Sequence, residues 1–368
     1  MSAEISERSV GGLRWLWVRG PRAEVFRALG GVAAAEIHAV LGGLPEAGAL
    51  KAFAETTAGR RLVGEVLAAT ERTHSRELTE LHDLAAGAGF DVDAMVLANL
   101  RGDLGGDDGV GCSDLGWRAE PPAARLRQGH LAEHSYIAHN EDGAPALSGR
   151  FMLLTLQLDG EQPVTAQWYP GFLPSNAFAA TAAGVAWGIN HVQVARPAVA
   201  PGRHFVARAL QHESSFEATI DYLRGIPTAG GFTYTIGDVH SGRVATVEVA
   251  AGQSAVVEAA PYIWHTNHLR YLEAPGGAAG SGGVRSLGQR EESEARGAVL
   301  DALTPVAPDR QWFLEVLTGS VRRTAAGDDP LMTHCSTVVD LTAAEITLQA
   351  DGQPPATVPW TEFVPQPE

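Results

Sequence analysis

The sequence predicts an α+β fold, and the order of its elements would suit two packed antiparallel sheets with helices outside, although pattern alone does not establish that layering. Two observations carry this prediction. Apolar residues recur at helical spacing up to about residue 100, and beyond residue 112 many strand-like segments follow one another as hairpins rather than alternating with helices. The 368 residues, of which 45% are hydrophobic, are enough for one large layered domain or for two domains.

The first hundred residues are predicted to be mainly helical from residue 22 onward. Val25 and Leu29 share one helical face, and a second run of this kind follows near residue 62, after a break at Pro45. Asp91 is a typical helix N-cap residue and predicts a further short helix up to residue 100. The glycine- and aspartate-rich stretch 102–111 ends the helical region.

Beyond residue 112, β-branched and aromatic residues predict strands that are bounded by turn residues. The predicted strands are 135–139, 151–158, 164–169, 179–183, 185–191, 231–236, 244–249, 254–258, 336–341 and 345–349. Asp159 and Gly160 have the chemistry of a hairpin turn. Helices are predicted at 205–223, 287–303 and 308–318, and a flexible surface loop at 275–283.

Charge and composition argue against several classes of function. The formal net charge of −16 disfavours a nucleic-acid or anionic-membrane surface, so we expect neither as a partner. No stretch has the roughly 18 uninterrupted apolar residues of a membrane span, and the N-terminus lacks a signal-peptide core. The two cysteines, Cys112 and Cys335, are expected to be free thiols in a reducing compartment, which predicts a cytoplasmic protein.

The most informative residue is Cys112, which follows the glycine-rich run 105–111. A thiol placed directly after Gly111 has an unhindered carbonyl behind it and a flexible backbone, which makes the junction a candidate self-cleavage site. Taken alone, Cys112 is more simply an inert packing thiol. Asp142 alone is a turn former before a glycine, and Asn267 alone caps a turn.

Four clusters along the chain suit acyl transfer when they are taken together. They offer a thiol, a carboxylate, an amide that could stabilise an oxyanion, and a guanidinium. The clusters are Gly111-Cys112-Ser113, His139-Asn140-Glu141-Asp142, His265-Thr266-Asn267-His268 and Arg322-Arg323.

The order of these motifs resembles the isopenicillin-N acyltransferase family of self-processing cysteine N-terminal nucleophile (Ntn) hydrolases. The resemblance rests on GCS, AHNEDG, AATAAGVAWGINHV, HTNHL and THCSTVVDL, and it runs from about residue 90 to the C-terminus. It implies a four-layer αββα sandwich and self-cleavage between Gly111 and Cys112. The products would be a helical α chain, 1–111, and a catalytic β chain, 112–368, packed together as one αββα unit.

The resemblance also implies roles for single residues. Cys112 would be the nucleophile, and its free α-amine, with an ordinary pKa of about 7.7–8.0, would be the base. Asp142 would orient that amine, and Asn267 would donate its side-chain amide to the oxyanion. Arg323 would be the arginine near the nucleophile, because the run 320–323 resembles the family's late serine-to-arginine segment.

The chain leaves one assignment open and departs from the family pattern in two places. Arg322 and Arg290 are alternatives to Arg323. Ser113-Asp114 follows the cysteine where the penicillin enzyme has two threonines, and Glu141 stands where the family has a tryptophan. The substrate of the penicillin enzyme is therefore not carried over.

A group of aromatic residues is predicted either to line a substrate pocket or to pack in the core. These residues are Trp168, Tyr169, Phe172, Phe178 and Trp187.

The expected function is cleavage of the amide of a small acylated amine or amino acid, or transfer of its acyl group, through a thioester on Cys112. An acyl-CoA-dependent N-acyltransferase of a specialised-metabolite pathway is one alternative, and a non-catalytic small-molecule-binding protein is another.

We expect no cofactor and no metal. A zinc site of His130, His134 and His139, or of His265 and His268, is a weaker alternative because the HExxH pattern is missing. Homo-oligomerisation remains open.

Overall fold

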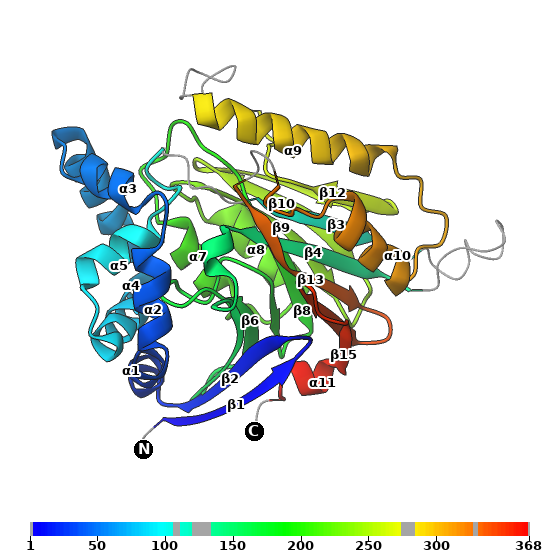
Figure 1. Cartoon of the computed structure of the whole chain (residues 1–368), viewed down its shortest axis with the longest axis horizontal. Coiled ribbons are helices and arrows are strands. Elements are labelled where there is room, and N and C mark those ends of the chain that lie inside the picture. The colour runs from blue at the N-terminus through cyan, green and yellow to red at the C-terminus, as the bar shows by residue number, and fades with distance from the viewer. Residues whose placement is uncertain (1–2, 106–110, 120–133, 274–283, 327–329, 367–368) are drawn as a thin grey trace.

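The computed structural model describes residues 3–105, 111–119, 134–273, 284–326 and 330–366. Two β-sheets lie face to face, and helices cover the outer side of each sheet (Figure 1). The sheets meet where β3 (Ser113–Trp117) and β4 (Tyr136–Gly143) of one contact β8 (Val185–His191) and β9 (Gly231–Asp238) of the other. The predicted α+β class and its αββα layering are therefore confirmed.

The larger sheet contains nine strands among the described residues, in the order β1-β2-β5-β6-β7-β8-β9-β10-β11. Its other strands are β1 (Glu4–Val10), β2 (Leu13–Gly20), β5 (Met152–Leu158), β6 (Val164–Trp168), β7 (Ala179–Thr181), β10 (Val244–Ala250) and β11 (Gln253–Glu258). Neighbouring strands are antiparallel except β2 and β5, which are parallel. The predicted Asp159-Gly160 turn joins β5 to β6.

The smaller sheet has six described strands, in the order β12-β3-β4-β13-β14-β15, all antiparallel. The strands not yet given are β12 (Tyr262–His265), β13 (Met332–Asp340), β14 (Glu345–Ala350) and β15 (Ala356–Pro359). β4 lies between β3 and β13, so its HNED motif has sequence-distant neighbours on both sides.

The early helices are close to those predicted. They are α1 (Arg22–Val32), α2 (Ala34–Gly42), α3 (Ala47–Ala54), α4 (Thr57–Ala88) and α5 (Val92–Asn99). The Asp91 side chain accepts a hydrogen bond from the backbone N–H of Ala94 at 2.8 Å, as its predicted capping role requires. α4 is broken at His74 and ends at Gly89, whose left-handed φ of 60° favours glycine.

The later helices divide between the two outer faces. α7 (Arg203–Leu210) and α8 (Phe216–Gly225) belong to the side of the larger sheet, and α9 (Val284–Ala302) and α10 (Arg310–Glu315) to that of the smaller sheet. The short elements are η1 (Pro145–Leu147), the π-helical turn η2 (Val316–Ser320) and α11 (Trp360–Phe363). The single helix predicted at 205–223 is two helices, because the Ser215 side chain caps a new helix start.

Several strands lie where none is predicted from the sequence. β1 and β2 form a hairpin at the start of the segment predicted as a helical α chain, which is therefore not entirely helical. β3, β12 and β15 are also additional. The predicted loop 275–283 lies outside the described residues.

Strand alternation separates the inter-sheet face from the helix-covered face of the larger sheet. On β8, Trp187 and Ile189 pack with Phe216 of α8. Gly188 has the opposite orientation, because a Cβ at that position would lie 2.8 Å from Nδ1 of His139 on the facing sheet. Asn190, two residues further, shares that inter-sheet side.

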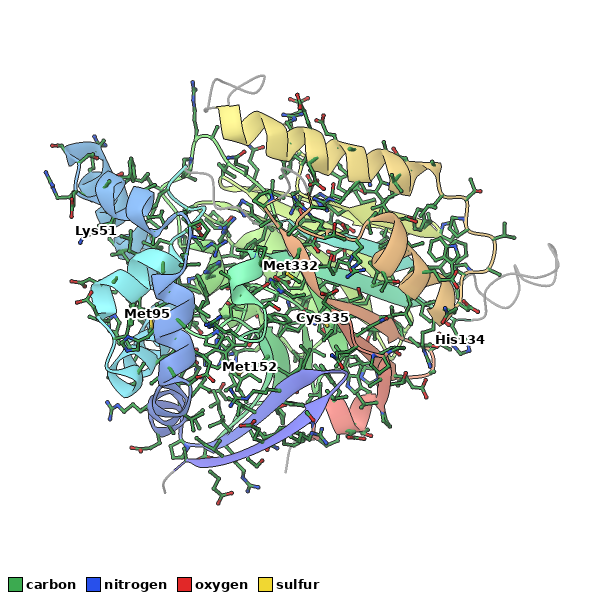
Figure 2. The ribbon with its side chains drawn as sticks, in the orientation of Figure 1. Lys51, Met95, His134, Met152, Met332 and Cys335 are labelled. Atoms are coloured by element: carbon green, nitrogen blue, oxygen red, sulfur yellow. The ribbon has the colours of Figure 1, made fainter. Side chains whose placement is uncertain are left out.

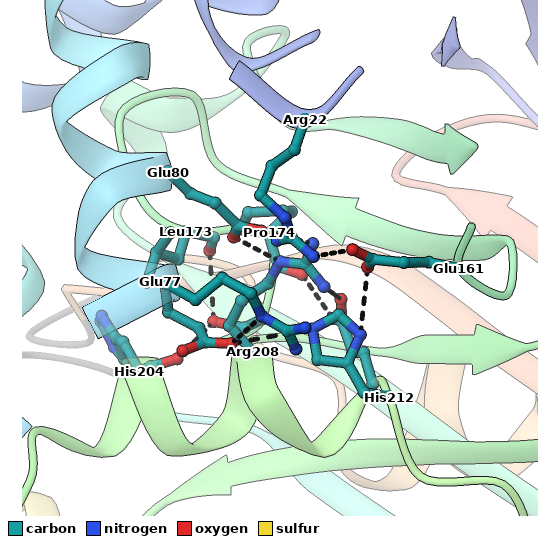
Figure 3. Close-up of polar contacts among 12 residues, drawn as sticks. Arg22, Glu77, Glu80, Glu161, Leu173, Pro174, His204, Arg208 and His212 are labelled. Carbon is teal, nitrogen blue, oxygen red and sulfur yellow. Dashed lines mark hydrogen bonds and ion pairs between the residues drawn. The ribbon is translucent and has the colours of Figure 1, made fainter. Parts of the chain in front are cut away.

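A buried ion-pair network joins α4 to the segment around α7 (Figure 3). The Arg208 guanidinium forms two hydrogen bonds to the Glu80 carboxylate, at 2.8 and 2.9 Å. Arg22 pairs with both Glu80 and Glu161. Burial lowers the pKa of Arg208 to about 10 despite its carboxylate neighbours. The segment before residue 105 is thus joined to the later chain by buried charges as well as by apolar packing.

In the described part of the chain, no single helix is both long enough and apolar enough to cross a membrane. α1 and α2 satisfy the length and composition test only as a pair, and they are bent by 72° relative to each other.

Candidate active site

Cys112 lies directly before β3, and its side chain is buried. Its backbone N–H donates to Oδ1 of Asn267 at 3.2 Å, and its carbonyl accepts from Nη1 of Arg296 at 2.6 Å. The preceding Gly111 has no space for a side chain, because a Cβ there would collide with the Arg323 guanidinium. The backbone around the Gly111–Cys112 bond is therefore enclosed by groups that come from distant parts of the sequence.

A buried polar chain occupies the inter-sheet space beside Cys112. Nδ1 of His139 lies 2.7 Å from Oδ1 of Asp114, and Nε2 of His139 lies 2.9 Å from Oε2 of Glu141. The Tyr169 hydroxyl donates to Oε1 of Glu141 at 2.8 Å. His139 and Glu141 share one face of β4 because side chains two apart on a strand point the same way.

The electrostatics of this region favour a neutral thiol and a charged imidazole. Burial raises the pKa of Cys112 well above its ordinary value, and the charges of Glu141 and Asp142 raise it further. Burial lowers the pKa of His139, but the charges and hydrogen bonds of Asp114 and Glu141 have the larger combined effect. Together they raise the pKa of His139 to about 10. A proton acceptor is therefore needed before Cys112 can attack as a thiolate.

Asp142 has one carboxyl oxygen satisfied and one open. Oδ1 accepts a hydrogen bond from the Thr333 hydroxyl at 2.6 Å, and Oδ2 is buried with no hydrogen-bond partner among the described residues. Burial raises the pKa of Asp142 to about 7, against the opposing effects of Arg296, Thr333 and Arg323. The open oxygen leaves capacity for one further donor, as the predicted role of orienting an amine requires.

Asn267 lies beside Cys112, as the motif order predicts, but its amide points differently from the predicted role. Oδ1 faces Cys112 and Arg296, while Nδ2 donates to the carbonyl of His191 at 3.0 Å. An amide NH₂ has two hydrogens, so one remains for another acceptor. Donation to an oxyanion stays a prediction.

Glu248 holds the loop that carries Asn267. Its buried carboxylate accepts backbone N–H bonds from Arg270, Tyr271 and Leu272, and it lies 2.8 Å from Nε2 of His265. Burial would raise the pKa of Glu248, but these hydrogen bonds and His265 lower it overall. A charged acceptor thus fixes both ends of the HTNH turn.

Arg296 of α9 is the site residue that sequence reasoning missed. Besides the Cys112 carbonyl it donates to Oγ of Ser113 at 2.7 Å and to Oδ1 of Asn267 at 2.6 Å. Its remaining contacts go to Glu292 one helical turn earlier, at 2.7 and 2.9 Å. The sequence offered one signal for Arg296, which is its position four residues after Glu292 on a predicted helix. The same spacing is typical of ion pairs on solvent-exposed helix faces, so it does not single out a site residue.

The three arginines predicted from the sequence are placed differently. Arg323 is buried against Gly111, and its guanidinium lies 3.2 Å from Glu292. Arg322 pairs instead with Asp351, and Arg290 with Glu294, in both cases with partly exposed side chains. Of the three, the structure brings Arg323 to the junction.

Asn190 is a second buried amide that the sequence analysis did not single out. It lies near the end of β8, on the strand face directed toward the other sheet, next to His191, whose carbonyl accepts from Asn267. Neither polar atom of the Asn190 side chain has a hydrogen-bond partner among the described residues. Such groups are rare in folded proteins, so Asn190 is a candidate contact for a bound substrate.

Among the predicted pocket aromatics, Tyr169 reaches the site through Glu141. Trp168, Phe172 and Phe178 belong to the main apolar core, and Trp187 packs against the α7–α8 layer. These four residues therefore pack in the core, which is one of the two arrangements that the sequence left open.

The histidines proposed as zinc ligands have other partners. His134 pairs with Asp340, and Figure 2 places it at the edge of the molecule, away from Cys335 in the interior. His265 lies against Glu248, and Nδ1 of His268 lies 2.9 Å from the Ser293 hydroxyl. His130 lies outside the described residues.

Comparisons with known proteins give one family match and several similar structures. Residues 131–298 match the family model "AAT: Acyl-coenzyme A:6-aminopenicillanic acid acyl-transferase", and no curated protein matches the sequence. Two variants of conjugated bile acid hydrolase from Clostridium perfringens are 11% and 12% identical. They cover 68% and 67% of this chain and 93% of their own, with TM-scores of 0.39 and 0.41. Penicillin V acylase from Agrobacterium tumefaciens is 11% identical over 68% of this chain and 87% of its own, with a TM-score of 0.39.

The matched segment contains HNED, the GINH strand and HTNH, and Arg296 lies near its end. The Gly111–Cys112 junction precedes it, and Arg323 follows it. The matched segment covers less than half of the chain, and the family it matches agrees with the resemblance that the ordered motifs carry.

Proposed function

We propose that this chain cleaves itself between Gly111 and Cys112 and then cleaves, or transfers the acyl group from, the amide of a small acylated amine or amino acid. The observation that carries this proposal is the enclosed junction. Cys112 is buried between Asn267 and Arg296, and Gly111 lies against Arg323. An inert packing cysteine would need none of these polar groups around its backbone.

In the mature form the Cys112 α-amine takes the thiol proton, and the sulfur attacks the acyl carbon. The C–N bond then breaks, the amine leaves with the proton, and the acyl group remains on sulfur as a thioester. Water then gives a carboxylic acid, whereas an amine gives a new amide. The open oxygen of Asp142 would accept from the α-amine, and the amides of Asn267 and Asn190 would face the oxyanion.

The two fragments are proposed to stay together after cleavage. Buried contacts of the early segment support this, because Asp103 accepts from the backbone N–H groups of Arg203 and Gly230. Asn99 also bonds to the backbone of Gly171 and Leu173 across the same boundary. The partners of the site would thus be a small-molecule acyl donor and the second fragment of the same chain.

Acyl transfer from an acyl-CoA donor is the second candidate, because the matching family model is described by that donor. A screen of N-acylated amines, N-acylated amino acids and acyl-CoA thioesters on the processed protein separates the two. Release of the free acid without an acceptor supports hydrolysis. Product formation that depends on both a thioester and an amine supports transfer.

The first test of the proposal is the intact mass of purified protein. Wild-type chain should give two fragments, one beginning at Cys112, whereas Cys112→Ala should remain one inactive chain. Cys335→Ala is the matched control, because this thiol is also buried and should leave cleavage unchanged. An intact wild-type chain that turns over substrate would contradict self-processing, and an intact, inactive chain that binds small molecules would favour the binding protein.

A further inference from the structure

Self-cleavage poses a proton-transfer problem that mature catalysis does not. This inference rests on the proposed function. Before cleavage the nitrogen of Cys112 is an amide, which donates its hydrogen to Asn267 and has no basic lone pair. The α-amine that serves as base in the mature form is therefore not yet present. Some other group must accept the thiol proton in the first reaction.

Three reactive side chains lie close enough to form such a relay. The Cys112 sulfur, a ring nitrogen of His139 and a carboxylate oxygen of Glu141 all lie within 4.8 Å of one another. The side chains of His139 and Glu141 are almost fully buried, at 2% and 1% exposed. Bulk water therefore competes little for the proton.

The contacts of each group decide which one is able to accept a proton. Both ring nitrogens of His139 lie against carboxylates, and its raised pKa keeps both protonated at neutral pH, so the ring has no free lone pair. The Tyr169 hydroxyl already donates to Glu141. Of His139, Tyr169 and Glu141, only the Glu141 carboxylate has lone pairs available to accept the proton.

We propose that Glu141 is the proton acceptor for self-cleavage, with His139 and Tyr169 holding its carboxylate in place. The Cys112 thiol proton passes to Glu141, and the sulfur bonds to the Gly111 carbonyl carbon. As the Gly111–Cys112 C–N bond breaks, the proton moves from Glu141 to the departing nitrogen, which becomes the α-amine. Water then hydrolyses the thioester, which releases the Gly111 carboxylate and restores the thiol. After this, the α-amine replaces Glu141 as base.

The test compares cleavage and turnover in full-length Glu141→Gln, which keeps the size of the side chain and removes its basicity. Cleavage, followed by intact mass over time, should slow about 100-fold or more, as expected when a general base is removed. Turnover per cleaved chain should fall much less. An equal loss of both would overturn the proposal, because it would indicate a shared structural or electrostatic role.

Two further variants separate the remaining explanations. Asp340→Asn removes the charge of another buried carboxylate that pairs with a histidine, on β13 of the same sheet, and should cleave at nearly the wild-type rate. Glu141→Asp keeps a carboxylate and should recover most of the rate. Cleavage of Glu141→Gln at the wild-type rate, or no gain from Glu141→Asp, would refute Glu141 as the acceptor. Failure of wild-type chain to cleave would instead refute the proposed function.

Discussion

At the residue scale, Arg296 links parts of the site that the sequence keeps apart. Its guanidinium contacts the backbone of Cys112 and the side chains of Ser113 and Asn267, while Glu292 fixes it from within α9. A guanidinium presents several N–H donors in a rigid plane, so one side chain holds these positions at once. Motif order predicted Cys112 and Asn267 as site residues, and the structure places them in contact. The residue that joins them depends on how α9 packs against the smaller sheet.

We expect Arg296→Lys to reduce turnover about 10- to 100-fold, because one ammonium is unable to replace the planar set of donors. Intact mass measures the effect on self-cleavage, and kcat/KM per cleaved chain measures the effect on substrate turnover. Arg290→Lys is the control on the same helix, since its exposed pair with Glu294 contributes only about 0.3–0.5 kcal/mol. Equal activity of the two variants would show that the contacts of Arg296 are not needed.

At the scale of elements, local pattern predicted most helices and the central strands, because their apolar spacing is strong. It failed where partners decide the structure. β3 begins with Ser113-Asp114, a poor strand sequence, and is a strand because β4 and β12 pair with it on both sides. β1 lies at the sheet edge with mostly exposed residues, so its sequence has no apolar signal. Asn190 was missed for a related reason. Only the folded chain shows that its side-chain amide is buried without a hydrogen-bond partner among the described residues.

The contact of α4 with α7 provides a prediction at this scale. Glu80→Gln should lower the free energy of unfolding by about 3–5 kcal/mol, because it leaves the buried Arg208 and the partly buried Arg22 without their shared carboxylate. Chemical denaturation monitored by circular dichroism measures the change. Glu65→Gln on the same helix removes an exposed pair with Arg61 and should change stability by less than about 0.5 kcal/mol. A similar small effect in both variants would mean that the network adds little.

At the scale of the whole molecule, the two sheets enclose charges whose ionisation is linked to folding. Burial raises the pKa of Asp142 from 3.8 to about 7, and flanking carboxylates raise that of His139 from 6.5 to about 10. A folded-state pKa above the unfolded value means that the folded chain binds the proton more tightly. Both groups therefore stabilise the fold at lower pH, and this stabilisation is lost as pH rises through their separate ranges.

The alkaline range isolates the contribution of His139. Its stabilisation is complete below about pH 6.5 and disappears as pH approaches about 10, a change on the order of a few kcal/mol because each pKa unit corresponds to about 1.4 kcal/mol. The free energy of unfolding of Cys112→Ala, which avoids mixing cleaved and intact chains, should fall between pH 7 and 10. Adding His139→Gln should flatten that decline even though it lowers stability overall. Adding His134→Gln, which removes a half-exposed partner of Asp340, should leave the slope as it was. An unchanged slope in the His139 variant would mean that Asp114 and Glu141 do not hold a charged imidazole between the sheets.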